Sequence, residues 1–187
     1  MSIEWVESGG GPLIAIPESV LGRWFGVFGG TTDVEDYDRA CAIDDYVGVI
    51  DVGGKSALVL ADQPAVTTFL PEARMFVRAV AGDAEDDEFI ALVPSVVAEA
   101  RWESGPEIVV QEPLVVFDSA GQFARLEEDE FIRVDISPGR YRVRAAEEEW
   151  GDAAEMILVQ LEPSRSCSLD SGEVLAGGDH GQMEEDD

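Results

Sequence analysis

The sequence predicts an α+β fold, mainly antiparallel β-sheet with one main helix at about residues 85–100 and short helical turns. Two observations lead to this prediction. Short runs rich in Val, Ile, Leu and Thr recur along the chain, bounded by Gly, Pro and Asp, as is typical of strands in a meander. Between Phe89 and Val97, in contrast, apolar residues fall at the i, i+3, i+4, i+7 and i+8 positions of a helix face.

The N-terminal part of the chain predicts short elements. Leu13–Ile16 is a compact apolar run that predicts a strand. Pro17-Glu18-Ser19 can cap a short helix over Val20–Phe25, and residues 37–43 have room for one helical turn. Three aromatic residues, Trp24, Phe25 and Phe28, precede that helical turn and are expected to pack as an apolar plug in the core.

The centre of the chain predicts a meander of three strands: Val47–Ile50, Ala57–Ala61 and Ala65–Leu70. A tight turn over Asp51–Ser56 joins the first two runs, and a Gln-Pro breaker precedes the third. Arg74–Val80 is largely apolar on both faces, so a strand and a buried helix remain alternatives there.

The main predicted helix follows an acidic loop, Asp83–Glu88, and contains Pro94. Proline lacks the N–H that a helix interior needs. Either the helix begins near Pro94, where proline suits the first turn, or it is kinked at that residue.

From Arg101 onward the pattern predicts strands. Glu107–Gln111 follows a predicted turn at Ser104–Pro106, and Pro113–Asp118 is a continuous apolar strand. Met156–Leu161 is almost entirely apolar and predicts a central strand. Between them, Glu147–Asp152 is predicted to be a loop that contains Trp150.

The clearest predicted hairpin joins Phe131–Ile136 to Arg140–Ala145 through Ser137-Pro138-Gly139. It would place Asp135 across from Arg142 and Val134 across from Val143, with charged and apolar pairs on separate faces. An L-Pro-Gly turn matches the twist of a hairpin poorly, so a bulge is expected nearby.

The change in composition near residue 163 predicts two parts. Residues 1–163 are expected to form a single globular domain, because the chain is long enough to bury one good core. Residues 164–187 are dominated by Ser, Gly, Asp and Glu, so we expect an acidic disordered tail.

The charge balance limits the partners that the chain can have. It carries 40 Asp and Glu against 12 Lys and Arg, a formal net charge of −28. This charge repels nucleic acid and anionic membranes, so neither is predicted as a partner. A basic protein would be attracted, and its encounter accelerated. A solvated acidic surface without a specific partner is the alternative interpretation.

The sequence favours a cytoplasmic location. Its two cysteines, Cys41 and Cys167, give no disulfide framework. The N-terminus lacks the basic start and apolar core of a signal peptide. No apolar run approaches the ~20 residues that a membrane span requires.

Motifs for cofactors and metals fail on their spacing. Asp51–Ser56 ends like a phosphate-binding P-loop, but Val49 stands where the motif needs glycine, and a strand follows in place of a helix. The acids of Asp83–Glu88 lack the glycine of an EF-hand loop. The single histidine, His180, lies in the predicted tail, so neither a zinc site nor a Ser/His/Asp arrangement is supported. We therefore predict no cofactor, no metal and no catalytic residue.

Cys41 has no obvious base beside it, which favours a buried structural thiol over a nucleophile. Tyr37 and Arg39 have two interpretations. They are either anchors of a partner-contact loop, or a Tyr packed under the sheet and an Arg paired with Asp36 or Asp38.

The acidic aromatic loop at 33–45 is the predicted partner-binding region, followed by the acidic segment that contains Trp150. The predicted contact residues are acids with a few Tyr, Arg and Trp side chains: Glu35, Asp36, Tyr37, Asp38, Arg39, Asp44, Asp45, Glu147, Glu148 and Trp150.

Several blocks of the chain resemble the immunity protein 21 family of bacterial polymorphic toxin systems, over roughly residues 4–163. The most specific blocks are Asp36-Tyr37-Asp38-Arg39-Ala40-Cys41 and Thr67-Thr68-Phe69-Leu70-Pro71. Trp5-Val6-Glu7-Ser8 and Gly10-Gly11-Pro12-Leu13-Ile14 add to them. At residues 61–64 the chain has Ala-Asp-Gln-Pro where Gly-Asp-Glu-Pro is expected.

The resemblance implies a non-enzymatic immunity protein that binds and neutralises a cognate toxin in the producing bacterium. Because many nuclease toxins are basic, an acidic inhibitor would be steered toward such a toxin. Two alternatives remain. A carboxylate-based hydrolase would need two close acids, one with a raised pKa. An acidic adaptor would bind a basic cellular protein.

Overall fold

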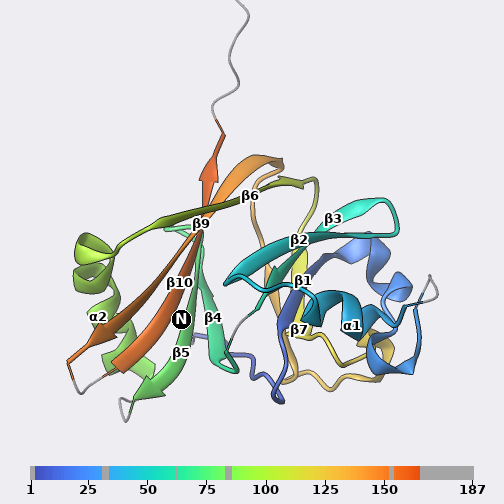
Figure 1. Ribbon diagram of the computed structural model, residues 1–187, viewed down its shortest axis with the longest axis horizontal. Coiled ribbons are helices and arrows are strands. Elements are labelled where there is room, and N and C mark those ends of the chain that lie inside the picture. Colours follow the sequence, from blue (N-terminus) through green and yellow to red (C-terminus); the bar gives the residue numbers. More distant parts are fainter. Residues whose placement is uncertain (1–2, 31–33, 62, 83–85, 152–153, 165–187) are drawn as a thin grey trace, which may run out of the picture.

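The computed structural model describes residues 3–30, 34–61, 63–82, 86–151 and 154–164. Within them, ten strands form two five-stranded antiparallel sheets, and the helices are few and short. Figure 1 shows the two sheets side by side, with α2 at one end and the smaller helices at the other. The predicted α+β class, mainly antiparallel sheet, is therefore confirmed.

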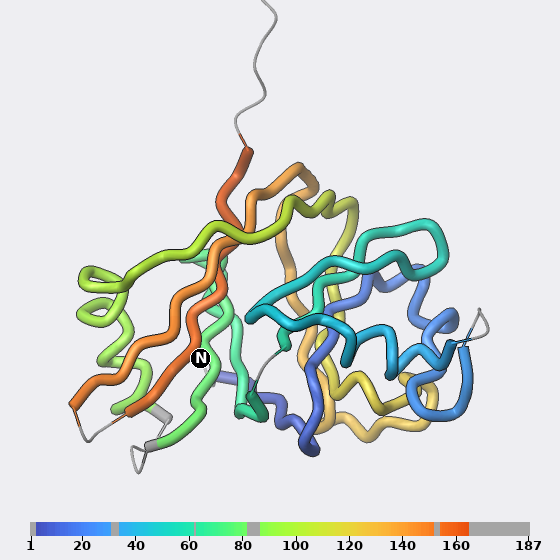
Figure 2. The backbone as a smooth tube through the Cα atoms, in the orientation of Figure 1, coloured from blue at the N-terminus to red at the C-terminus, as the bar shows by residue number. Residues whose placement is uncertain are grey.

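The first sheet has the strand order β2-β3-β1-β7-β8. Its strands are β1 (Leu13–Pro17), β2 (Val47–Val52), β3 (Lys55–Leu60), β7 (Leu114–Asp118) and β8 (Phe131–Val134). The second sheet has the order β4-β5-β10-β9-β6. Its strands are β4 (Val66–Leu70), β5 (Met75–Gly82), β6 (Glu103–Val110), β9 (Gly139–Trp150) and β10 (Ala154–Pro163). The tube in Figure 2 shows how the chain crosses repeatedly between the two sheets.

The outer faces of the two sheets are covered differently. Helix α2 (Asp86–Glu99) packs on the second sheet through Phe89, Val93 and Val96. The outer face of the first sheet is covered by short pieces: η1 (Glu18–Arg23), η2 (Gly26–Phe28), α1 (Asp36–Cys41) and η3 (Phe123–Arg125). Among the described residues, no helix combines the length and the apolar character needed to cross a bilayer.

The sheets are apolar on both faces because each is buried on both. Leu13 and Ala15 of β1 point into the core between the sheets, whereas Ile14 and Ile16 point out toward the short helices. The same alternation in β10 sends Val159 inward and Leu158 toward α2. Burying each Val, Leu or Ile side chain contributes about 1.5–3 kcal/mol. This double burial explains the unbroken apolar runs in the sequence.

The predicted hairpin between residues 131 and 145 is wrong. β8 pairs with β7 in the first sheet, whereas β9 pairs with β10 and β6 in the second. Ile132 and Val134 of β8, and Tyr141 and Val143 of β9, all face the same inter-sheet core. Alternation alone therefore fits two strands that face each other across a sandwich as well as it fits two paired strands.

The predicted three-strand meander is correct only in part. β2 and β3 form the expected hairpin, and its turn uses Gly53 and Gly54 at φ values of 61° and 84°. The third run, β4, pairs with β5 in the second sheet. Arg78 of β5 is fully buried and donates to the carbonyls of Ala61 and Gln63, so it fixes the crossover between the sheets.

Three local predictions need correction. Ser104–Pro106 is not a turn, because β6 runs through it with a register shift between Ser104 and Glu107 on an edge strand. Glu147–Trp150 is not a loop, because β9 continues through it; Asp152 lies outside the described residues. The main helix is confirmed as Asp86–Glu99, with Pro94 inside it, so it does not begin there.

Two further expectations are settled by the strands. Met75–Gly82 is a strand, β5, which decides between the two alternatives for that run. β10 lies at the centre of its sheet, as predicted. Of the expected tail, Ser164 alone is described, and its N–H donates to the carbonyl of Arg140 at 2.8 Å.

Candidate partner-binding surface

The short helix α1 carries the central acids of the predicted contact loop. Glu35, Asp38 and the nearby Asp44 and Asp45 are exposed, whereas Asp36 is fully buried. The Phe25 N–H donates to Asp36 Oδ2 at 2.9 Å, and Arg39 Nη1 donates to Asp36 Oδ1 at 3.0 Å. The Asp36 carboxylate therefore holds the local fold and does not face solvent.

Arg39 connects α1 to strand β2 through its side chain. Besides its ion pair with Asp36, it donates to the carbonyl of Asp51, at the start of the β2–β3 turn. A charge-assisted pair of this kind is stronger than a neutral hydrogen bond. Of the two interpretations of Arg39, the structure shows pairing with Asp36.

Tyr37 packs against the N-terminal glycines. A Cβ atom at Gly11 would overlap the Tyr37 hydroxyl, so the close approach requires glycine. The hydrogen bond with Cys41, together with partial burial, raises the pKa of Tyr37 above its usual value. Cys41 itself is exposed, so the expectation of a buried thiol is wrong. The two side chains and Asp44 line a shallow hollow of about 380 Å³.

The structure brings one distant predicted residue to this region. Glu147 of β9 accepts hydrogen bonds from the Tyr46 hydroxyl and from Gln63 Nε2, each at 2.8 Å. Tyr46 follows Asp45 directly, and Asp45 Oδ1 accepts from the Tyr46 N–H at 2.8 Å. The Tyr46 side chain therefore links Glu147 of the second sheet to the segment that carries Asp44 and Asp45.

Glu148 and Trp150 lie elsewhere. Glu148 Oε1 accepts from the Arg101 N–H at 2.6 Å, just after α2. Trp150 packs against the cluster under α2. Successive residues of a strand point to opposite faces, so Glu147 is separated from both.

Three apolar side chains beside α1 are exposed, although the sequence pattern did not predict their exposure. Phe28 is 58% exposed, Val34 49% and Val27 43%. The sequence predicts that Phe28 and Trp24 belong to one apolar plug. Trp24 is indeed buried and donates its Nε1–H to the Ser119 carbonyl at 2.9 Å, whereas Phe28 is exposed. The available signal was the glycines on either side, Gly26 and Gly29-Gly30, which mark a turn that holds its side chains away from the core.

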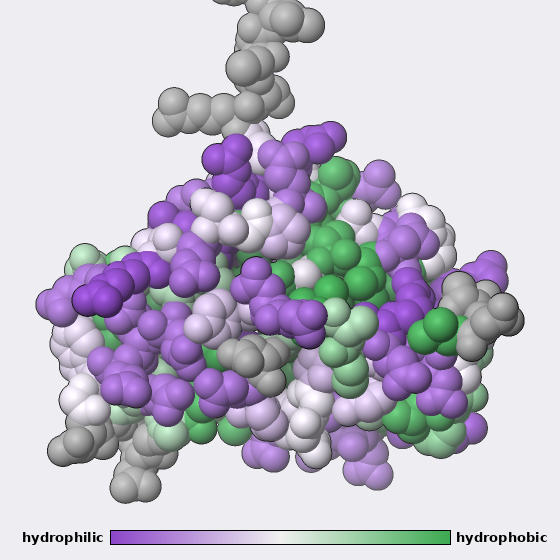
Figure 3. All heavy atoms as spheres, in the orientation of Figure 1, coloured by the Kyte–Doolittle hydropathy of each residue, from purple (hydrophilic) through white to green (hydrophobic). Residues whose placement is uncertain are grey.

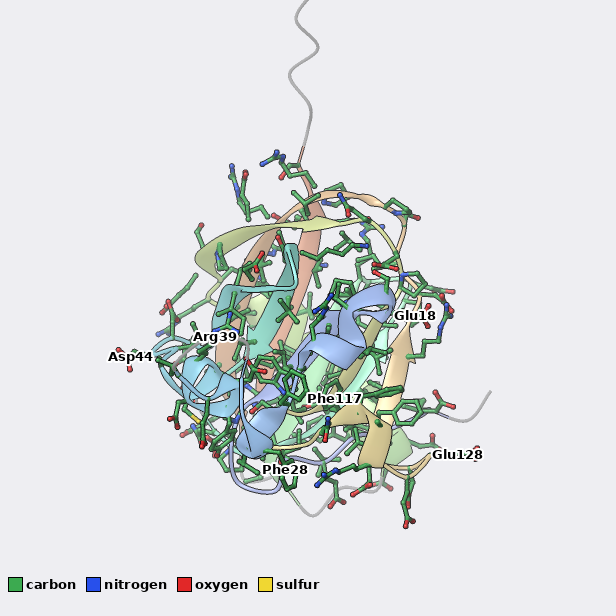
Figure 4. All side chains as sticks on the ribbon, turned by 90° about the vertical axis from the view of Figure 1, so that its right-hand side faces the viewer. Glu18, Phe28, Arg39, Asp44, Phe117 and Glu128 are labelled. Atoms are coloured by element: carbon green, nitrogen blue, oxygen red, sulfur yellow. The ribbon has the colours of Figure 1, made fainter. Side chains whose placement is uncertain are left out.

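A second acidic segment follows Arg125, a residue in contact with Phe28. The Arg125 guanidinium lies 4.2 Å from the centre of the Phe28 ring, which places the two chain segments in contact. The next acids along the chain are all exposed: Glu127, Glu128, Asp129 and Glu130. In Figure 4, Phe28 lies low on this face, with Asp44 toward one side and Glu128 toward the other.

The segment Asp51–Ser56, which ends like a P-loop, has a structural role in this fold. Lys55 opens strand β3 and pairs with Glu112, which also accepts a hydrogen bond from the Ser19 hydroxyl at 2.7 Å. The bond from Lys55 holds the pKa of Glu112 below its usual value. In the described part of the chain, no group of three or more His, Cys, Asp or Glu side chains has an arrangement suited to a metal ion.

Comparison with known protein families places this surface in context. The sequence model described as Immunity protein 21 matches residues 4–154. The chain belongs to the immunity protein 21 family. The immunity protein 21 match takes in both acidic segments and every strand up to the first residue of β10. Neither the curated proteins nor the solved structures gave a match.

Proposed function

We propose that this member of the immunity protein 21 family is a non-enzymatic, cytoplasmic protein that binds a cognate toxin of a polymorphic toxin system and neutralises it in the producing bacterium. The observation that carries this proposal is the family match over residues 4–154. An immunity protein acts by occluding its toxin, so the chemistry to be explained is that of a contact surface.

The proposed surface is the acidic end of the first sheet. It is formed by Glu35 and Asp38 of the α1 region and by Asp44 and Asp45, with Glu147 beside them and Tyr37 lining the adjacent hollow. Asp36 and Arg39 support the surface from within. Glu148 and Trp150 lie toward α2 and take no part in it.

The charge of this surface suits a basic toxin such as a nuclease. Exposed carboxylates steer a basic protein toward the correct face and raise the association rate more than the final affinity. The same carboxylates would occupy positions that nucleic-acid phosphates take on a nuclease. The formal net charge of −28 extends this attraction over the whole molecule.

The test uses the toxin domain encoded beside the gene of this chain. Co-expression of the wild-type chain should rescue growth of cells that produce the toxin. The triple variant D38K/D44K/D45K should bind the toxin at least about 100-fold more weakly at low salt, mostly through a slower association rate.

The matched control is D87K/E88K/E99K, which reverses three exposed acids on α2 and changes the net charge equally. Equal losses for both triple variants would show that net charge matters and the proposed surface does not. Failure of the wild-type chain to bind the toxin or to rescue growth would reject the proposed function.

A further inference from the structure

Most of the exposed large apolar side chains in the described part of the chain lie beside α1. Four are found among the described residues, and three of them flank α1: Val27, Phe28 and Val34, which we call the apolar tip. The fourth, Val109, is 38% exposed on β6. Single exposed hydrophobic residues are ordinary, but several on neighbouring segments are typical of an interaction site.

The backbone beneath Phe28 is fixed by contacts with a distant part of the chain. The Val27 N–H donates to the Ala120 carbonyl at 3.1 Å. Gly26 has a φ of 59°, and a Cβ atom there would run into the same carbonyl oxygen. The Phe28 N–H closes the turn on the Phe25 carbonyl at 3.0 Å. These contacts constrain the backbone that carries Phe28.

Asp36 fixes both ends of the same turn. Its carboxylate accepts from the Phe25 N–H, and its own N–H donates to the Gly29 carbonyl at 3.0 Å. Burying a carboxylate is costly and is compensated only by such bonds. The result is an aromatic side chain that is exposed and yet held on a rigid base. A preorganised aromatic loses little entropy when a partner covers it, which is the property of a binding hot spot.

The surroundings of the tip indicate the chemistry of the partner. Glu35 and Asp38 lie on the α1 side, and Glu127–Glu130 follow the Arg125 that stacks on the Phe28 ring. Apart from Arg125, the charged residues near the tip are acids, and an apolar centre with mainly acidic surroundings is complementary to an apolar pocket with a basic rim. A second copy of the same face would bring like charges together, which disfavours self-association.

We propose that the apolar tip is the anchor of the toxin complex, with Phe28 inserted into an apolar pocket of a basic toxin. This inference rests on the proposed function and adds to it the residue that contributes most to the affinity. The carboxylates around the tip orient the toxin, and Phe28 fixes it by excluding water.

Figure 3 shows the rival site, a group of hydrophobic side chains over the region where β2 and β3 approach β6. Val109 of β6 is exposed, and β6 lies against β2 and β3, so this residue is suited to probing that region. A comparison of Phe28 with Val109 therefore distinguishes the two surfaces.

The experiment measures binding of purified chain to the toxin domain encoded beside its gene, by calorimetry or interferometry. F28A should weaken binding about 30-fold and F28D about 100-fold or more, chiefly by faster dissociation. F28W should keep affinity within about threefold, because Trp also suits an apolar pocket. V109D should change affinity less than about threefold.

Each outcome decides the inference. Wild-type binding with F28A and F28D unchanged overturns it and leaves the proposed function intact, whereas no wild-type binding overturns both. If V109D lowers the affinity for the toxin more than F28D does, the binding site lies in the β2–β6 region and not at the apolar tip. A concentration-dependent dimer that F28D abolishes, with toxin affinity unchanged, shows that the tip pairs copies of the chain. Melting curves check folding, and V27D tests the tip independently of Phe28.

Discussion

Helical segments cover the outer faces of both sheets, but the segments on the two sheets differ in kind. The second sheet is covered by α2, one regular helix of 14 residues whose buried side chains follow the helix period. The first sheet is covered by three 3-10 helices, the six-residue α1 and the turns between them. The regular layer is held by apolar packing, whereas the irregular layer combines apolar packing with hydrogen bonds between segments that are distant in sequence.

This difference coincides with the distribution of exposed groups. Layers that rely on packing turn their apolar residues inward, as α2 does with Phe89, Val93 and Val96. A layer fixed by backbone hydrogen bonds can hold an aromatic residue outward, as the turn below Phe28 does. Binding residues commonly lie on irregular segments held by a rigid scaffold, and the first sheet supplies that scaffold here.

The largest expected effect comes from removing the buried carboxylate of the irregular layer. D36A leaves the Phe25 N–H without its acceptor and Arg39 without its ion pair, and should lower the free energy of unfolding by about 3 kcal/mol. Urea unfolding measures this value. The control is D38A, which removes an exposed acid of the same helix and should change it by less than about 0.5 kcal/mol. Equal values for the two variants would mean that packing alone holds the irregular layer.

A smaller effect is expected in the regular layer, and with the opposite sign. P94A restores a backbone N–H in the interior of α2 at an exposed position, and should raise the free energy of unfolding by about 1 kcal/mol. S95A, at the neighbouring exposed position, provides the baseline for a change that adds no backbone donor. A loss of stability in P94A would show that proline at this position favours the packing of α2 on its sheet.

The smallest effect concerns Glu112, which ties η1 to β3 through Ser19 and Lys55. The pKa of this carboxyl is below its ordinary value of 4.5, mainly because Lys55 bonds to the ionised form. A lowered pKa contributes stability above the unfolded value and loses it as the pH falls. E112Q should therefore melt slightly below the wild type at pH 7, and the difference should shrink as the pH falls below 4.5 and through the lowered pKa of Glu112. A gap of constant size from pH 7 to pH 3 would contradict this assignment.

Sequence periodicity predicted much of the fold because it reports which faces are buried. It gave the sheet-rich class, α2 and the central position of β10. It did not give the strand pairing at residues 131–145, because Ile132 and Tyr141 face the same core from opposite sheets. Side-chain alternation is a local property, and the choice between pairing and facing is made by the whole chain.

The candidate site was predicted in a similar, partial way. Exposed acids such as Asp38 and Asp44 could be found from composition, because carboxylates are seldom buried. Asp36 is the exception, and its burial depends on the position of the Phe25 N–H. The exposure of Phe28 depends on a carbonyl at Ala120, far along the chain, which no local pattern in the sequence reports.

The central place of β10 has a consequence for the order in which the protein forms. The first sheet has all of its strands once residue 134 has left the ribosome, whereas β4 and β5 must wait for residues 154–163 to receive their central neighbour. Until then, β5 presents an unpaired edge, and such edges favour association with other chains. During synthesis, the acidic first sheet can therefore close early, and the second sheet remains the slow and aggregation-sensitive step.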